Sequence, residues 1–189
     1  MSKILKEYIK TILKNIDMGL EKNRKAKLVK LAQVIKRNHE QQNIVKITFI
    51  CTHNSRRSQF SQVWAYVSSL YFKLDFIKPF SGGTEIDTVN LNAINSLINS
   101  GLKIEKAYKD KTIYLLKSFK KDKGINLYSK AYNSKLNPSK HFIAIMTCSD
   151  ADQMCPEIKG ADKKISLPYS DPRVADNTGL EKKVYNQTC

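Results

Sequence analysis

Residues 43–58 read NIVKITFICTHNSRRS, an apolar run followed by a polar segment with one cysteine and two adjacent arginines. The run over 43–50 is rich in β-branched and apolar side chains, which predicts a buried strand. Residues 58–72 (SQFSQVWAYVSSLYF) then predict a helix. Cys51 therefore stands where a strand ends, and Arg57 stands where a helix begins, with five residues between them.

The same alternation of strand and helix continues along the chain. Further strands are predicted over 76–80, 141–147 and 164–167, and further helices over 88–100, stopped by Gly101, and over 149–154, with Ser149 as a possible N-cap. Strands that alternate with helices predict an α/β fold, a doubly wound parallel sheet with helices on both faces.

Two segments lie outside this pattern. Residues 1–42 have the apolar spacing of two amphipathic helices with a break at 17–19, and they predict a helical N-terminal extension. We expect this extension to pack as an appendage, with a membrane-surface element as the alternative. The domain over 43–189 carries a basic insertion at about 103–140. Short strands are predicted in it over 113–119 and 125–128, and a last helix is predicted over 179–187.

The charge is strongly basic and unevenly distributed. The 189 residues have a net charge of +16, of which +7 lies in residues 1–42 and +8 in residues 103–140. Such segments could bind nucleic acid or an acidic partner, but no nucleic-acid motif accompanies them, so a solvated lysine-rich surface is favoured. No apolar run approaches the roughly 18 residues of a membrane span, and no signal peptide is evident, so a cytoplasmic protein is expected.

The cysteines are too few for a disulfide framework. They stand at positions 51, 148, 155 and 189, and in a chain without an export signal they are expected to be free, catalytic or metal-binding. A zinc site would need four ligands, typically with two closely spaced cysteine pairs. The histidines at 39, 53 and 141 form no ligand pattern, so neither a metal nor a cofactor is expected. Cys189 is interpreted as a bystander.

The segment between Cys51 and Ser58 has the composition of an anion cradle. Backbone N–H groups of such a loop, together with the helix N-terminus, bind a tetrahedral oxyanion, and Arg57 adds a bidentate fork. The same positive field favours a Cys51 thiolate, the nucleophilic form of cysteine. Ser58 can donate to that thiolate, and Asn54 can hold the shape of the loop. The predicted oxyanion-binding residues are Thr52, His53, Asn54, Ser55, Arg56, Arg57 and Ser58.

The stretch CTHNSRRSQ (51–59) resembles the phosphate-binding loop of low-molecular-weight protein tyrosine phosphatases and of the thioredoxin-coupled arsenate reductases that share their fold. Phe80–Glu85 (FSGGTE) is similar to the family's turn after its second strand, and Ser170-Asp171-Pro172 to its Asp-Pro pair. The resemblance covers 43–178 without the insertion, and it implies a flavodoxin-like parallel sheet. It also implies that Asp171 is a general acid that protonates a leaving oxygen. The alternative is that Asp171-Pro172 only forms a turn.

Residues 147–156 (TCSDADQMCP) closely resemble the redox helix of those reductases, which carries two cysteines with six residues between them. The resemblance implies that Cys51 attacks arsenic and that Cys148 then attacks Cys51 and expels arsenite. Cys155 then attacks Cys148, and thioredoxin reduces the resulting disulfide. Seven residues of helix span about 10.5 Å, whereas a disulfide joins Cα atoms roughly 4.4–6.8 Å apart, so this helix must open on oxidation.

Three functions remain open from the sequence. The leading expectation is an arsenate reductase regenerated by thioredoxin, with Cys51, Arg57, Asp171, Cys148 and Cys155 as its catalytic residues. The alternative is a low-molecular-weight protein tyrosine phosphatase that hydrolyses phosphotyrosine or small phosphate esters through a phosphocysteine, with the cysteine pair as a redox guard. A basic binding module without catalysis is the third. The loop departs from the family in having His53 where glycine is common and Arg56 where a cysteine is common.

Overall fold

The computed structural model describes residues 1–107, 113–117 and 124–189. The chain forms two compact units. The parallel-sheet unit comprises Val29–Thr88 and Ser129–Asp171, and the antiparallel-sheet unit comprises Met1–Leu28, Val89–Tyr128 and Pro172–Cys189. The assignment of residues 1–42 as a separate appendage stays a prediction. All the residues from which the sequence predicts chemistry lie in the parallel-sheet unit.

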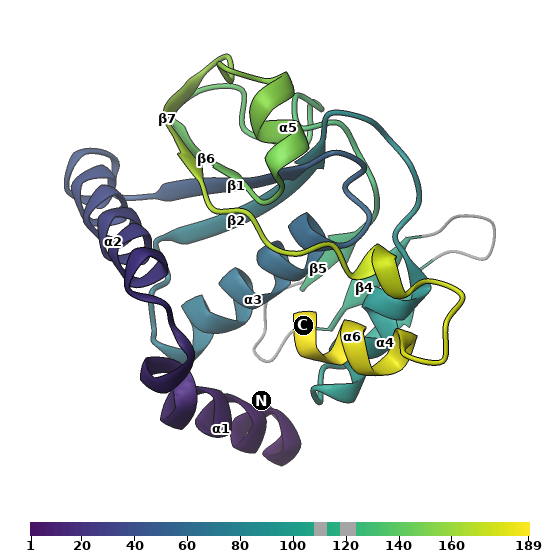
Figure 1. Ribbon diagram of the computed structural model, residues 1–189. Coiled ribbons are helices and arrows are strands. Elements are labelled where there is room, and N and C mark those ends of the chain that lie inside the picture. The colour runs from purple at the N-terminus through teal and green to yellow at the C-terminus, as the bar shows by residue number, and fades with distance from the viewer. Residues whose placement is uncertain (108–112, 118–123) are drawn as a thin grey trace. The chain divides into compact units, whose positions relative to one another are not determined.

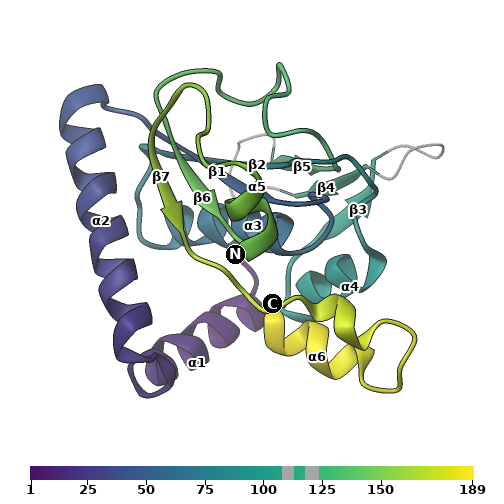
Figure 2. The same ribbon diagram turned by 45° about the horizontal axis from the view of Figure 1, so that its top comes forward.

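Four parallel strands form the centre of the parallel-sheet unit (Figures 1 and 2), in the order β2-β1-β6-β7. The strands are β1 (Val45–Cys51), β2 (Ile77–Gly83), β6 (Phe142–Met146) and β7 (Ala161–Ser166). The β-branched and apolar run of β1 occupies a central position, and six of its seven residues are buried. The predicted α/β fold with a parallel sheet is therefore confirmed.

Helices α3 (Arg57–Tyr71) and α5 (Ser149–Met154) flank this sheet. Helix α3 follows β1 and packs on β1 and β2, whereas α5 follows β6 and packs on β1 and β6. The β1–α3–β2 and β6–α5–β7 connections run in opposite directions along the sheet, so right-handed crossovers place the two helices on opposite faces. The face under α5 holds one hydrophobic cluster, which includes Ile50, Ala144 and Met146.

The N-terminal residues form two helices, α1 (Lys3–Gly19) and α2 (Lys22–Gln42), as the amphipathic spacing predicts. The break between them lies after Gly19, where Leu20 adopts an extended conformation, and not at 17–19 as predicted. The side chain of Ser2 caps α1 by accepting from the Leu5 N–H. The end of α2 belongs to the parallel-sheet unit, where the His39 ring stacks on Phe76 with 3.8 Å between ring centroids.

The antiparallel-sheet unit contains the rest of the secondary structure. Its elements are α1, the first residues of α2, α4 (Leu91–Asn99), β3 (Ile104–Lys106), β4 (Tyr114–Leu116), β5 (Ile125–Leu127), the 3-10 helix η1 (Pro172–Ala175) and α6 (Glu181–Thr188). Strands β3, β4 and β5 form an antiparallel sheet, in which β4 and β5 were predicted and β3 was not. Of the predicted strand over 113–119, residues 118–119 lie outside the described residues. Gly101, with φ of +95°, stops α4 as predicted.

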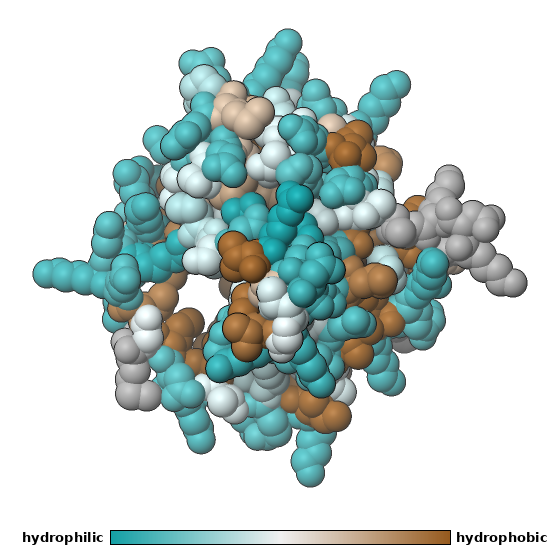
Figure 3. Space-filling view, turned by 45° about the vertical axis from the view of Figure 1, so that its right-hand side comes forward, coloured by the Kyte–Doolittle hydropathy of each residue, from teal (hydrophilic) through white to brown (hydrophobic). Residues whose placement is uncertain are grey.

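The surface agrees with the basic composition. The face in Figure 3 is mostly hydrophilic, and hydrophobic side chains are scattered over it singly or in small groups. Within the described ranges, no helix is both long enough and apolar enough to cross a membrane.

Candidate active site

Cys51 is the last residue of β1, and Arg57 is the first residue of α3, so the loop between them lies at the carboxyl edge of the parallel sheet. A small cavity there is lined by Cys51, His53, Ser55, Arg56, Arg57 and Asp171. The structure thus brings the predicted nucleophile, the predicted arginine fork and the predicted general acid around one cavity. The other predicted loop residues, Thr52, Asn54 and Ser58, do not line it and instead support the residues that do.

A buried hydrogen-bond network holds the Cys51 side chain in place. The Ser58 Oγ lies 3.1 Å from the Cys51 Sγ, and the Asn54 Nδ2 donates to the same Ser58 Oγ at 2.8 Å. Because Ser58 accepts from Asn54, its own hydroxyl hydrogen is available to Cys51, which suits a thiolate acceptor. Asn54 has φ of +48°, a left-handed conformation that asparagine tolerates better than most residues. Gln59 Nε2 donates to the Asn54 carbonyl at 2.9 Å.

Two residues of the predicted insertion donate hydrogen bonds to this loop. The Lys130 N–H donates to the Asn54 Oδ1 at 3.0 Å, and the Ser129 Oγ donates to the His53 carbonyl at 2.8 Å. Burial lowers the pKa of the Lys130 amine to about 8. Neither residue carries a signal in the sequence, since both lie in a lysine-rich segment with no clear pattern.

Gly83, at the end of β2, lies against the backbone of the loop. A Cβ atom at this position would lie 2.5 Å from the Thr52 carbonyl oxygen and 2.3 Å from the Glu85 carbonyl oxygen. The backbone approaches so closely because the Thr84 N–H donates to the Cys51 carbonyl and the Glu85 N–H donates to the Thr52 carbonyl. The small-residue turn noted in the sequence therefore packs directly on the candidate site.

An ion pair of Arg57 and a contact of His53 with a carboxylate lie at the rim of the cavity. The Arg57 Nη2 donates to the Asp171 Oδ2 at 2.5 Å, and its Nη1 donates to the Tyr169 carbonyl at 3.4 Å. Only 11% of the Arg57 side chain is exposed, so its charge is directed into the cavity region and not into bulk water. His53 lies 3.2 Å from Glu85, measured from Nε2 to Oε2. Arg56, one of the predicted oxyanion-binding residues, also lines the cavity.

Cys148 occupies the N-cap of α5, a position that the sequence assigned to Ser149. Cys148 has the extended conformation of an N-cap, and its Sγ accepts from the Ala151 N–H at 3.4 Å. Ser149 is already helical, and its Oγ donates to Asp150. The prediction was wrong because serine is a far commoner cap than cysteine, whereas the end of β6 decides where the helix begins. The hydroxyl of Thr52 lies 3.5 Å from the Cys148 Sγ.

Three of the four cysteines meet in one place. Cys51 and Cys148 belong to the hydrophobic cluster under α5, and the partly buried Cys155 packs against it. None of these three forms a disulfide. Cys189 belongs to the antiparallel-sheet unit, where its Sγ lies 3.5 Å from the Ser100 Oγ. In the part of the chain that the structure describes, no group of three or more His, Cys, Asp and Glu side chains could hold a metal ion.

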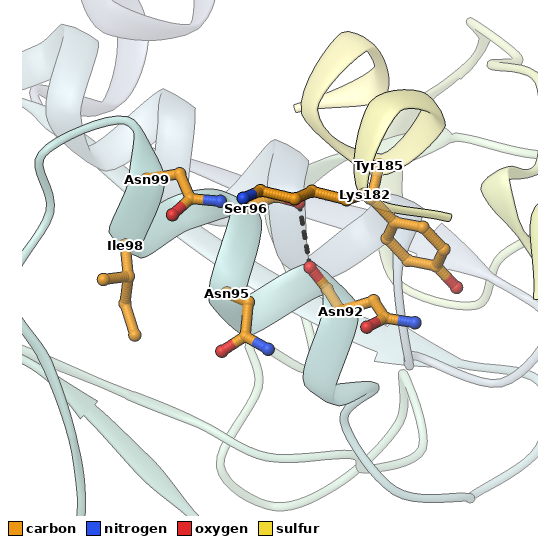
Figure 4. A pocket seen from close by; sticks show the side chains of 7 residues that line it. All are labelled: Asn92, Asn95, Ser96, Ile98, Asn99, Lys182 and Tyr185. Carbon is orange, nitrogen blue, oxygen red and sulfur yellow. Dashed lines mark hydrogen bonds between the residues drawn. The ribbon is translucent and has the colours of Figure 1, made fainter. Parts of the chain in front are cut away.

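A larger cavity lies between α4 and α6 in the antiparallel-sheet unit (Figure 4), with a volume of about 350 Å³. Its lining is mostly polar and consists of Asn92, Asn95, Ser96, Ile98, Asn99, Lys182 and Tyr185. It contains neither a thiol nor a carboxylate, so it offers no nucleophile comparable with Cys51.

The chain is similar to an arsenate reductase from Brevibacillus brevis, with 26% identity over 158 residues, which cover 78% of this chain and 98% of the relative. A low-molecular-weight protein tyrosine phosphatase from Bacillus subtilis matches the structure with a TM-score of 0.51 and 16% identity, covering 76% of this chain and 87% of that one. A low-molecular-weight phosphotyrosine phosphatase from Vibrio cholerae O395 matches with a TM-score of 0.50 and 12% identity, covering 76% and 86%.

No family model matches the sequence. The two structural likenesses concern the fold, and the sequence similarity spans almost the whole of the reductase. The chain therefore has the fold of the low-molecular-weight protein tyrosine phosphatases, and its sequence is similar to that of an arsenate reductase.

Proposed function

We propose that the chain reduces arsenate to arsenite, with Cys51 as the nucleophile and with Cys148 and Cys155 as a relay that thioredoxin regenerates. The observation that carries this proposal is the packing of these three cysteines in and against one cluster. A phosphatase needs the first cysteine alone, because phosphate-ester hydrolysis involves no change in oxidation state. Two further thiols beside the nucleophile favour a reaction that consumes electrons.

In the first step, arsenate enters the cavity beside Cys51. Its oxygens replace Asp171 as acceptors for some of the N–H groups of Arg57. The Cys51 thiolate attacks arsenic and forms a sulfur–arsenic bond. A leaving oxygen takes a proton from Asp171 and departs as water. The place of Asp171 at the rim of the same cavity supports this role.

In the second step, the Cys148 thiolate attacks the Cys51 sulfur. A Cys51–Cys148 disulfide forms, the sulfur–arsenic bond breaks, and its electron pair stays on arsenic, which leaves as arsenite. The Thr52 hydroxyl and the Ala151 N–H both lie within hydrogen-bond distance of the Cys148 sulfur and hold it in place beside the loop that carries Cys51.

In the third step, the Cys155 thiolate attacks the Cys148 sulfur and releases the Cys51 thiolate for another cycle. The Cys148–Cys155 disulfide is then reduced by a dithiol of thioredoxin, which supplies the two electrons that arsenic received. Because this regeneration needs a reducing compartment, we place the reaction in the cytoplasm.

A phosphatase is the second candidate function, and the Arg57–Asp171 pair beside Cys51 supports it. The same thiolate could attack phosphorus, and the same carboxyl group could protonate the ester oxygen. In that case the substrate would be phosphotyrosine or a small phosphate ester, and Cys148 would protect Cys51 against over-oxidation.

The test is NADPH consumption by the reduced protein with thioredoxin and thioredoxin reductase, with and without arsenate. A parallel sample measures hydrolysis of an aryl phosphate. Arsenate-dependent NADPH oxidation is the expected result. Hydrolysis alone would replace the reductase with the phosphatase, and a lack of response in both samples would contradict both proposals.

A further inference from the structure

Lys164, a residue of β7, contacts the end of α5 at three points. Its Nζ lies 2.6 Å from the Asp152 Oδ1, 2.8 Å from the Asp152 carbonyl oxygen and 3.4 Å from the Pro156 carbonyl oxygen. Asp152 and Pro156 lie on either side of Cys155. Each side chain of the ion pair is only 23% exposed, so the pair is partly shielded from solvent.

The register of the sheet explains why this lysine reaches the helix. Lys164 is paired with Ala144 of β6, and Ala144 belongs to the cluster that packs under α5. Lys164 therefore lies on the face of the sheet that α5 covers. A cation at this position also suits the negative end of a helix, where the last carbonyl groups lack partners within the helix.

We propose that Lys164 is a latch that holds the Cys148–Cys155 segment in its helical, reduced form and thereby sets how readily the disulfide is reduced. This inference rests on the proposed relay. Cys148 and Cys155 cap the two ends of the six-residue helix, and a disulfide between them requires their Cα atoms to come within roughly 4.4–6.8 Å. The helix must open to allow this, and the contacts of Lys164 around Cys155 must then be given up.

The direction of the effect follows from this geometry. The latch stabilises the dithiol form and is lost in the disulfide form, so it favours reduction of the disulfide. Without the latch, the dithiol is less stable relative to the disulfide, and the reduction potential becomes more negative. The exchange is balanced, since two thiols of an external dithiol become a disulfide while Cys148 and Cys155 each gain a proton and an electron.

The test uses the full chain with Cys51→Ser and Cys189→Ser, so that Cys148 and Cys155 are the only pair. The protein is equilibrated with mixtures of reduced and oxidised dithiothreitol, and the fraction of disulfide is measured by alkylation and mass spectrometry. We expect Lys164→Met to shift the equilibrium constant about tenfold towards the disulfide, which corresponds to about 30 mV. Asp152→Asn keeps the carbonyl contacts and should shift it about threefold.

Lys163→Met is the matched control. Lys163 is the preceding residue of β7 and is paired with Ile143, so its side chain lies on the opposite face of the sheet. This variant loses the same charge from the same strand and should leave the equilibrium constant within twofold. Equal equilibrium constants for Lys164→Met and Lys163→Met would overturn the latch.

Hydrogen exchange of the reduced protein separates a latch from general destabilisation. In Lys164→Met, the backbone amides of 149–155 should exchange about tenfold faster, while those of β1 and β6 keep their rates. Faster exchange throughout the sheet would mean that Lys164 only stabilises the fold. Neither measurement uses arsenate, so a failure of the latch differs visibly from a failure of the reductase. If no Cys148–Cys155 disulfide forms in any variant, the proposed relay fails instead.

Discussion

The parallel sheet has two junctions at which a cysteine follows a strand and precedes a helix, and the two are built differently. At the β1–α3 junction, five residues separate Cys51 from the helix, and its sulfur is contacted by the Ser58 hydroxyl within a buried network. At the β6–α5 junction, Cys148 is itself the N-cap, and its sulfur accepts a backbone N–H. Both thiols are almost fully buried, with exposures of 3% and 0%.

The difference teaches how one sheet edge can serve both binding and motion. Backbone, side chains and Gly83 surround the first junction, which suits a site that must keep its shape around a small anion. The second junction leads into a helix of only six residues, whose end is held by a lysine. The free energy needed to open a short helix that is held by few contacts is small. We therefore propose that the first junction binds and attacks the substrate and that the second junction moves.

The largest effect is expected at the first junction. Cys51→Ser removes the thiolate on which both candidate reactions depend, so arsenate reduction and aryl phosphate hydrolysis should each fall about 10⁴-fold or more. Cys189→Ser, in the other unit, is the control and should leave both rates within about twofold. Residual activity of Cys51→Ser near the level of the control would mean that the nucleophile lies elsewhere.

Substitution at the second junction sharpens the comparison. Cys148→Ser or Cys155→Ser should lower multiple-turnover arsenate reduction by about 100-fold or more, because the oxidised protein is not regenerated. Oxyanion binding and any hydrolysis of an aryl phosphate should persist, since the first junction is intact. Steady-state NADPH oxidation measures multiple-turnover reduction. Competition between phosphate and arsenate measures oxyanion binding. Full turnover by Cys148→Ser would refute the relay.

A methyl group at Gly83 tests the rigidity of the first junction. Gly83→Ala places a Cβ atom against the Thr52 and Glu85 carbonyl oxygens, and backbone atoms cannot move away as a side chain can. The free energy of unfolding should fall by about 3 kcal/mol, measured by chemical denaturation. Gly179→Ala is the matched control, because a Cβ there meets no atom within 4 Å. If the two variants unfold at the same denaturant concentration, the close packing around Gly83 is not needed.

The smallest effect concerns the buried amine of Lys130, next to the first junction. Burial lowers the pKa of Lys130 to about 8 from 10.5, so the unfolded chain binds more protons than the folded chain between these values. The free energy of unfolding should therefore rise, by about 2 kcal/mol, as the pH increases from 8 to 10.5. Lys130→Met should lack this rise, whereas Lys135→Met, at an exposed position, should keep it. Identical pH profiles for the wild type and Lys130→Met would contradict the burial of the charge.

The sequence predicted what depends on neighbouring residues. The strand before Cys51, the helix after Arg57 and the helix over 149–154 could each be recognised, because hydrophobic periodicity and turn residues act within a few positions. The same local pattern carried the resemblance to the phosphatase superfamily, and with it the choice of Asp171, Cys148 and Cys155. Local pattern failed at β3, which it did not predict, and at the N-cap of α5, where it favoured Ser149 over Cys148.

Tertiary structure alone decided which distant residues hold these groups in place. Asn54 and Lys130 are 76 positions apart, and Lys164 meets Asp152 only because the register of β7 on β6 puts both on one face. Hydrogen bonds between such residues depend on how the strands pair, and no short-range pattern in a lysine-rich segment encodes them. The sequence by itself determined which atoms are proposed to react, and the pairing of the strands determined which distant residues hold those atoms in place.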